Sequence, residues 1–265
     1  MDHIHQRYHI LIKHNDSILL CLDNKDCFKL ERGSLIPHST LNIFRTFATG
    51  VTINSETFIF GGPWGEDTYE YLPKGSNTWI LGNCKIPGGM ENACAIPIES
   101  KQEILLIGGS INNYGTQKRI LKFKVKNHTF EELPTKLIYG RQGHRCAFIP
   151  GTKKIIITGG ASLHHSSMSS TEILDTEDYS ITMAQNQMNV GRSCHGIGII
   201  TVNDEDRLAV FGGINRQCGA LESVEIYNAD TQKWVMSDMK LSGKRYGFGF
   251  LSVKYKDLTK LRACF

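Results

Sequence analysis

The sequence predicts an all-β fold assembled from repeated units. Hydrophobic runs stop on two glycines four times, as "TFIFGG", "ILLIGG", "IIITGG" and "LAVFGG", with the glycine pairs at residues 61–62, 108–109, 159–160 and 212–213. The pairs are 47, 51 and 53 residues apart, close to the roughly 50-residue period of one type of propeller blade. No stretch shows a convincing helical period of 3.6 residues. Together these observations predict a β-propeller.

Two further features recur in phase with the glycine pairs. Upstream, an arginine opens a β-like run in "FRTFATGVTI", "GRQGHRCAFIP" and "GRSCHGIGIIT". Downstream, the eleven-residue stretches "YEYLPKGSNTW", "ILKFKVKNHTF" and "VEIYNADTQKW" each end on an aromatic residue, and the shorter "TEILDTEDY" ends on Tyr179. Three features in the same order establish the repeat.

Each unit is interpreted as four short strands. The first is the arginine-led run, and the second is the apolar run that ends on the glycine pair. The third surrounds Glu70, Phe123, Glu172 or Glu225, and the fourth carries the aromatic residue. β-Branched and aromatic residues dominate these runs, while Gly, Asn, Asp, Ser and Pro fill the gaps. The second strand is continuously apolar, so we expect both of its faces to be covered.

The glycine pair is predicted to serve packing and turning. Inner strands of neighbouring blades crowd together, and a residue without a Cβ lets their backbones approach and adopts φ values that other residues avoid. Neither GxGxxG nor GxxxxGK[ST] follows any of the pairs, so these are not nucleotide-binding loops.

Aligning the units predicts five four-stranded blades and a partial sixth, all within a single domain over residues 1–265. The first unit starts at Arg7 and has Leu22 and Asp23 where later units have the glycine pair. The last, "RYGFGFLSVKYKDLTKLRACF", ends after about two strands. A half-blade exposes strand edges, so we expect a truncated ring or one that depends on a cover. The units start near residues 7, 45, 89, 141, 192 and 245.

The repeat resembles the kelch repeat over nearly the whole chain. The resemblance rests on the glycine pair after an apolar run, on the Tyr-Asn-x-Asp-Thr-x-x-Trp spacing of "VEIYNADTQKW", and on the arginine before the next strand. It is specific for the fold and says little about function. Kelch propellers usually hold six or seven blades. They often act as substrate receptors of ubiquitin ligases or as cytoskeletal organisers, and they include a copper radical oxidase and a sialic acid mutarotase.

Two sets of residues are candidates for a role at the rims of the ring. The recurrent arginines either surround one mouth of the channel or hold the carbonyls of a neighbouring blade or a carboxylate such as Glu172 or Glu225; these are Arg7, Arg45, Arg141, Arg192 and Arg245. Residues that differ between blades, on the loops of one face, are better candidates for binding a partner; these are Trp64, Tyr114, Arg119, His164 and Arg216.

The sequence does not suggest catalytic residues, a metal site or a cofactor. His144 and His195 occupy a slot that holds Ile, Ala or Phe in other units, which favours packing. Cys194 and His195 are neighbours on a strand and point to opposite faces, so they do not form a nucleophile–base pair. No CxxC pair or zinc-ligand spacing is present.

The cysteines fall into two groups. Cys94 and Cys146 lie five residues after a unit start, in a slot that elsewhere holds isoleucine, and are expected to act as small buried hydrophobes. Cys21 and Cys27 flank a predicted turn between strands and can face each other across a hairpin. A disulfide there implies an oxidising compartment.

Composition narrows the classes of partner. The net charge of +4 and pI of about 8.5 come without a Lys/Arg block, so nucleic acid is not expected as a partner. No apolar stretch approaches the roughly 18 residues of a membrane span. The first residues lack the apolar core of a secretory signal. We expect a cytoplasmic protein, or an extracellular one if the N-terminus is incomplete and Cys21 and Cys27 are bridged.

The leading functional hypothesis is a non-catalytic protein-interaction scaffold that binds a segment of a partner protein on one face of the propeller. By the kelch resemblance, such a scaffold is a ubiquitin-ligase substrate receptor or a cytoskeletal organiser. The alternatives are a secreted kelch-type binding protein and a sugar-modifying, mutarotase-like propeller enzyme.

Overall fold

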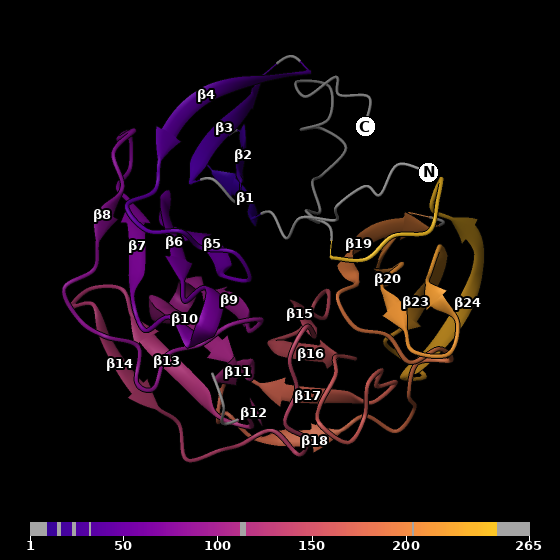
Figure 1. Cartoon of the computed structure of the whole chain (residues 1–265). Coiled ribbons are helices and arrows are strands. Elements are labelled where there is room, and N and C mark those ends of the chain that lie inside the picture. Colours follow the sequence, from indigo (N-terminus) through magenta and orange to yellow (C-terminus); the bar gives the residue numbers. More distant parts are fainter. Residues whose placement is uncertain are drawn as a thin grey trace.

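The computed structural model describes residues 10–14, 17–22, 25–31, 33–111, 115–202 and 204–247. Five four-stranded antiparallel sheets stand around a central hole as a five-bladed β-propeller (Figure 1). This confirms the predicted all-β fold. No helix among these residues is long and apolar enough to cross a membrane.

The blades follow one another in the order of the chain. Within each blade, every strand is hydrogen-bonded to the strand of that blade that comes next in the sequence. Blade 1 contains β1 (Ile10–His14), β2 (Ser17–Cys21), β3 (Asp26–Glu31) and β4 (Ser34–Thr40). Blade 2 contains β5 (Thr49–Ile53), β6 (Glu56–Phe60), β7 (Tyr69–Leu72) and β8 (Ile80–Leu81). Blade 3 contains β9 (Cys94–Ile98), β10 (Glu103–Ile107), β13 (Ile120–Lys124) and β14 (Thr129–Glu132). Blade 4 contains β15 (Arg145–Phe148), β16 (Lys154–Thr158), β17 (Thr171–Asp175) and β18 (Ile181–Met183). Blade 5 contains β19 (Gly196–Val202), β20 (Glu205–Phe211), β23 (Ser223–Asn228) and β24 (Lys233–Lys240).

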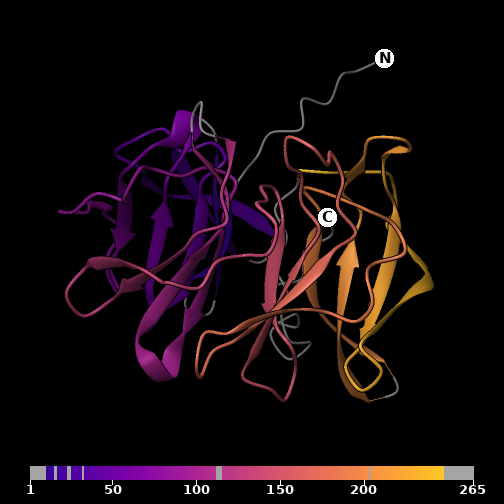
Figure 2. The ribbon, with the colours of Figure 1, turned by 90° about the horizontal axis from the view of Figure 1, so that it is seen from below.

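Short elements lie in the loops between these strands. They are the 3-10 turns η1 (Pro63–Gly65) and η2 (Glu99–Lys101), and the strand pairs β11 (Ser110–Ile111) with β12 (Gly115–Thr116) and β21 (Ile214–Asn215) with β22 (Gly219–Ala220). The first strand of each blade lies nearest the hole and the fourth lies outermost (Figure 1). In the perpendicular view the strands stand beside one another around the ring (Figure 2).

The hydrophobic core is divided into four clusters, one at each interface between consecutive blades. The second strands feed two clusters at once: in β6, Phe58 and Phe60 face blade 3 while Ile59 faces blade 1. All three side chains are fully buried. The continuously apolar pattern of these strands therefore arises because each is sandwiched between two other sheets.

The glycine pairs sit where adjacent blades come closest. Gly159 has φ 61°, and a Cβ there would overlap the Arg192 carbonyl and lie 2.9 Å from Cε1 of His195. Gly160 has φ 98°, and a Cβ there would lie 2.9 Å from the Gln142 carbonyl oxygen. Both the left-handed backbone and the close approach require glycine.

One expectation about the cysteines is wrong. Cys94 and Cys146 do not act as separate buried hydrophobes, because a disulfide joins them and links β9 of blade 3 to β15 of blade 4. Cys94 pairs with Ile107, the residue before a glycine pair, whereas Cys146 pairs with Ile157, two residues before the next one. The two cysteines are thus one register position apart in their blades. An offset of one residue places a side chain on the opposite face of its sheet. Cys94 and Cys146 therefore point toward each other across the interface between blades 3 and 4.

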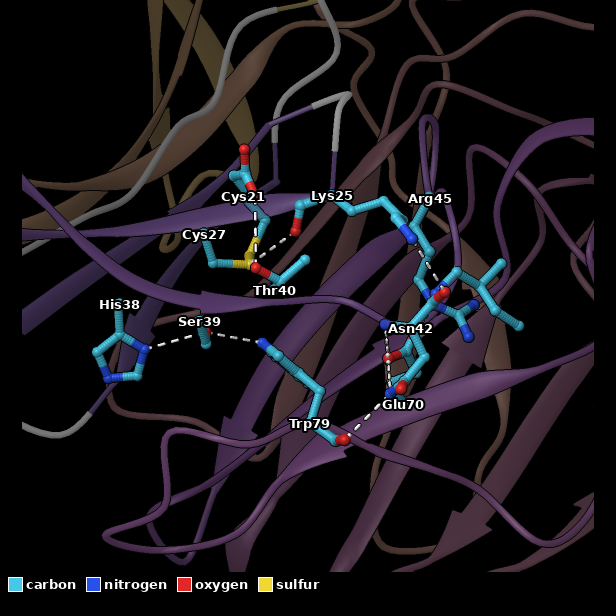
Figure 3. The surroundings of a disulfide bond; sticks show 12 residues. Cys21, Lys25, Cys27, His38, Ser39, Thr40, Asn42, Arg45, Glu70 and Trp79 are labelled. Atoms are coloured by element: carbon cyan, nitrogen blue, oxygen red, sulfur yellow. Dashed lines mark hydrogen bonds and ion pairs between the residues drawn. A yellow bond between two sulfur atoms is a disulfide. The ribbon is translucent and has the colours of Figure 1, made fainter.

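The cysteine pair for which the sequence allows a disulfide is also bridged. Cys21 and Cys27 face each other in the β2–β3 ladder and form a disulfide. Figure 3 shows this bond beside Lys25 and Thr40, with the Asn42–Glu70 contacts of the next blade nearby. Arg7 and most of the predicted sixth unit, residues 248–265, lie outside the described residues.

Candidate partner-binding face

The loops between the second and third strands of blades 2 to 5 gather at one end of the propeller. They comprise residues 61–68, 108–119, 159–170 and 212–222, and residues 112–114 are not described. Because equivalent strands run in the same direction in every blade, all four loops leave the ring at the same end. We call this end, together with the residues that lead into each first strand, the loop face.

Neighbouring loops are joined into a continuous rim. The loops of blades 2, 3 and 4 each donate a backbone hydrogen bond to the segment that leads into the next blade, from Gly62 to Met90, Gly109 to Arg141 and Gly160 to Arg192, at 3.1, 2.9 and 2.9 Å. That segment in turn forms a β-bridge with the loop of its own blade, at Glu91–Ser110, Gln142–Ala161 and Ser193–Ile214. In addition, the Arg216 N–H donates to Ser167 Oγ at 3.0 Å, which ties the loop of blade 5 to that of blade 4. The loop face is therefore a connected surface rather than a set of independent loops.

Large apolar side chains project from this surface. Trp64 is 76% exposed and Leu163 is 82% exposed. Phe44 and Tyr139, from the segments leading into blades 2 and 4, are also exposed. Trp64 sits at φ 59°, in the left-handed region that bulky residues avoid. Exposed aromatic and aliphatic residues gathered on one face are characteristic of interaction surfaces.

The predicted binding residues differ in their exposure and contacts. Trp64, His164 and Arg216 are exposed on the loop face. Arg119 is half-buried, and its guanidinium donates to the carbonyls of Pro87 and Gly89. Burial lowers the pKa of Arg119. Its contacts hold the segment that leads into blade 3. Tyr114 lies outside the described residues.

The sequence interpretation missed several exposed apolar residues on this face, among them Phe44, Tyr139 and Leu163. Leu163 carried a usable signal, because it is a bulky apolar residue inside the polar loop "ASLHHSSMSS". Phe44 and Tyr139 carried no such signal. They lie one and two residues before a repeat arginine, where the sequence does not distinguish an exposed residue from a strand residue.

Three of the recurrent arginines, Arg45, Arg141 and Arg192, point into their blades. Arg245 is exposed, and its side chain donates to Ser242 Oγ at 3.2 Å and the Gly243 carbonyl at 3.3 Å. Arg141 is fully buried; its guanidinium donates to the Gly159 carbonyl at 2.7 Å and to Glu172 of β17 at 2.5 Å. Arg192 makes the same contacts with Gly212 and Glu225, each at 2.7 Å. Arg45 likewise binds Gly61 and Glu70, at 2.7 and 2.8 Å. The guanidinium groups of these three arginines therefore close their own blades.

The carboxylates complete the arrangement by holding the chain that arrives from the previous blade. Glu172 accepts the N–H groups of Ile138 and Tyr139, three and two residues before Arg141, at 2.7 and 3.1 Å. Glu70 and Glu225 accept the N–H groups at the same offsets before Arg45 and Arg192. Each buried arginine and its carboxylate thus form a recurring site that we call the carboxylate socket.

Blade 3 replaces both members of the socket. Met90 takes the position of the arginine, since its carbonyl accepts from the Gly62 N–H as that of Arg192 accepts from Gly160. Leu121 pairs with Leu106 as Glu172 pairs with Ile157. Both Met90 and Leu121 are buried. The joint replacement leaves no buried charge without its counterion.

Two buried histidines stand behind the glycine pairs. His195 Nε2 lies 2.8 Å from Thr158 Oγ1. Burial, followed by the charge of Arg192, lowers the pKa of His195 well below 6.5, and burial together with Arg141 does the same for His144. Both side chains are fully buried, so these histidines are neutral packing residues at neutral pH.

A chain of backbone hydrogen bonds circles the hole. The N–H of Asn92 donates to Phe47, Gly143 to Asn92, Cys194 to Gly143 and Gly247 to Cys194, at 2.8, 3.0, 2.7 and 2.9 Å. All five residues have φ between 51° and 64°. We call this series the neck. It connects the first strands of successive blades and fixes the loop face above it.

Among the described residues, no group of three or more His, Cys, Asp or Glu side chains is arranged to hold a metal ion. No protein-family model matches this sequence, and a comparison with curated proteins finds no significant match.

Proposed function

We propose that this propeller is a non-catalytic interaction scaffold that binds a segment of a partner protein on its loop face. The observation that carries the proposal is the exposure of Trp64 and Leu163 on a rim whose loops are linked by backbone hydrogen bonds and β-bridges. Interface energies concentrate in a few large anchors, and rigid presentation reduces the ordering cost of binding.

The chemistry of the face favours a partner segment that is apolar with acidic flanks. Arg216 and Lys118 are exposed there beside the apolar side chains. Apolar groups of the partner would cover Trp64 and Leu163, while carboxylates would meet the two cations at the polar rim of the interface.

The kelch-type character of the repeat belongs to this proposal. The socket, the glycine pair and the aromatic fourth strand recur in register, which supports the resemblance. By that resemblance the scaffold is a ubiquitin-ligase substrate receptor or a cytoskeletal organiser.

The experiment is affinity purification of the full chain from cells, with three baits compared by quantitative mass spectrometry. These are the wild type, the double variant Trp64→Ala/Leu163→Ala, and Met236→Ala, which removes an exposed side chain on the outer strand β24. We expect partners that the Met236→Ala control retains and the double variant loses. Equal recovery by all three folded baits, or no partner at all, would contradict the proposal.

The cysteines bear on the compartment. Disulfides persist in oxidising compartments and are rare in the cytosol, and four cysteines are paired here. We therefore propose the extracellular or lumenal alternative over the cytoplasmic expectation. Fractionation of cells under alkylating conditions tests this proposal. We expect both disulfides in protein from a secretory or extracellular fraction; cytosolic protein with all four cysteines alkylated would overturn it.

A further inference from the structure

An exposed turn joins β13 to β14 in blade 3. It covers residues 125–128 and has His128 at φ 54°. The His128 N–H closes the turn by donating to the Lys124 carbonyl at 2.9 Å. Because β13 runs away from the loop at 108–119, which belongs to the loop face, the turn lies at the opposite end of the propeller. It is therefore separate from the surface that we propose to bind a partner.

The triplet Asn127-His128-Thr129 begins in this turn. Asparagine followed two residues later by threonine, with no proline between them, is the acceptor pattern of N-linked glycosylation. The sequence contains one other such triplet, Asn15-Asp16-Ser17, and its asparagine lies outside the described residues. Asn127 is therefore the acceptor asparagine whose surroundings the structure describes.

The first and last residues of the triplet are exposed to solvent. Both Asn127 and Thr129 are exposed, and the Thr129 hydroxyl donates to Oδ1 of Asn127 at 2.9 Å. The side-chain nitrogen Nδ2 of Asn127 makes no hydrogen bond with a described residue. Nδ2 is the atom to which an N-linked glycan is attached. The folded chain can therefore carry a glycan there without losing a hydrogen bond between described residues.

The middle residue of the triplet holds the turn against blade 2. Nδ1 of His128 lies 3.0 Å from the Tyr69 hydroxyl, and the His128 ring packs edge-on against Tyr71 with the ring centroids 4.8 Å apart. The Cys84 thiol, from the segment after blade 2, donates to the His128 carbonyl at 2.7 Å. His128 thus anchors the turn while its neighbour Asn127 stays at the surface, so a glycan on Asn127 does not disturb these contacts.

The disulfides are a second, independent observation in favour of glycosylation. Disulfides form in oxidising compartments, and the same secretory compartments attach N-linked glycans to surface loops. The disulfide between Cys94 and Cys146 begins on β9, which belongs to the same sheet as the turn, since β9 and β13 both pair with β10. Blade 3 therefore combines a disulfide with an exposed acceptor asparagine.

We propose that Asn127 carries an N-linked oligosaccharide, an inference that rests on the extracellular or lumenal compartment proposed above. Nδ2 forms a bond to the anomeric carbon of a lipid-diphosphate-linked oligosaccharide, while the bond from that carbon to the diphosphate oxygen breaks. The diphosphate leaves with the electron pair, and Nδ2 gives up one proton to a base of the transferase. The glycan stands at the end of blade 3 opposite the loop face, which stays open to its partner.

The experiment delivers the full chain to the endoplasmic reticulum of cultured cells behind a cleavable signal peptide. Peptide-N-glycosidase releases N-linked glycans and converts each glycosylated asparagine to aspartate, so mass spectrometry of treated and untreated protein identifies the site. We expect conversion at Asn127 in the wild type and in Thr129→Ser, which keeps the acceptor pattern. Thr129→Ala should abolish it, and Asn127→Gln should carry one glycan fewer than the wild type. Asn15→Gln is the matched control and should leave conversion at Asn127 unchanged.

The site and the compartment fail separately. Unmodified Asn127 in delivered wild-type protein that has formed both disulfides would overturn the glycosylation site, as would equal conversion in Thr129→Ala. Native protein found in the cytosol with all four cysteines alkylated would instead contradict the compartment, whatever the delivered chain shows.

Partner recovery tests the placement of the glycan. Folded Asn127→Gln should still recover the partners that Trp64→Ala/Leu163→Ala loses, because the turn and the loop face lie at opposite ends of the ring. Loss of those partners from Asn127→Gln would contradict a glycan that leaves the loop face open.

Discussion

At the scale of single residues, the socket explains why arginine recurs at one point of each unit. A buried arginine is tolerated when its charge is paired and its donors are satisfied. Arg45 donates to the carbonyls of Gly61 and Thr68, to Thr68 Oγ1 and to Glu70. The socket arginine and its glutamate therefore use their hydrogen bonds to connect the incoming chain with two strands of one blade.

The Met90 and Leu121 pair of blade 3 suggests a direct test of whether the buried arginine and glutamate act as a pair. Arg141→Met alone leaves Glu172 buried without its cation and should lower the free energy of unfolding by about 3–5 kcal/mol. Arg141→Met/Glu172→Leu copies the Met90 and Leu121 pair and should be more stable than either single variant. Urea unfolding of the three variants measures this. Additive losses in the double variant would show that the residues do not act as a pair.

The buried histidines predict a pH dependence of stability. The pKa of His195 is depressed in the folded protein, so below about pH 6.5 the unfolded chain binds a proton that the folded protein does not. Stability should fall as the pH falls below that value, by about 1.4 kcal/mol per pH unit for each such group.

Unfolding between pH 5 and 7.5 checks the assignment. His195→Gln should give a shallower dependence on pH than the wild type, whereas His164→Gln, at an exposed loop position, should not. Identical slopes for the wild type and His195→Gln would contradict the account.

At the scale of elements, the glycine pairs decide how closely blades pack. Gly159→Ala should destabilise the protein through both its φ of 61° and its overlap with the Arg192 carbonyl. Gly151→Ala is a matched control, because it has φ 73° with nothing within 4 Å of the added Cβ. We expect Gly159→Ala to cost about 1–3 kcal/mol more than the control. Equal costs in thermal unfolding would mean that only backbone conformation, and not blade contact, requires glycine.

The disulfide between β9 and β15 ties two blades together across 52 residues of sequence. Removing it as Cys94→Ala/Cys146→Ala should lower stability by about 2–4 kcal/mol. The shorter Cys21–Cys27 bridge, across six residues, should contribute less, because it constrains the unfolded chain less. Unfolding with and without reductant measures both. A reductant-insensitive wild type would contradict the prediction.

The cysteine error shows where the repeat alignment lost accuracy. The unit near Gly89 lacks its arginine, so nothing in the sequence fixed its register to one residue. The structure places Met90, rather than Gly89, at the arginine position. The one-residue error placed Cys94 in the same slot as Cys146, and hence on the wrong face of its sheet.

At the scale of the whole molecule, the repeat was sufficient to predict the propeller. The spacing of the glycine pairs predicts the length of one blade, and the apolar second strands predict sheets packed on both faces. The loop face was harder to predict, because nothing in the sequence distinguishes the exposed Phe44 and Tyr139 from strand residues. Arg119 illustrates this: its position on a loop that differs between blades made it a binding candidate, but it holds the Pro87 and Gly89 carbonyls.

The radial arrangement of the blades depends on the neck. Hydrogen bonds within a sheet form whether or not blades assemble, but the N–H groups of Asn92, Gly143 and Cys194 each donate to a residue of the preceding blade. Their protection therefore reports the radial arrangement itself.

Hydrogen–deuterium exchange of the native protein, resolved to single amides, is the most direct test. We predict that the Asn92, Gly143 and Cys194 amides exchange as slowly as those of the second strands. If these three exchange at the rate of exposed loop amides while the sheets remain protected, the blades do not close around a common neck and the account is contradicted.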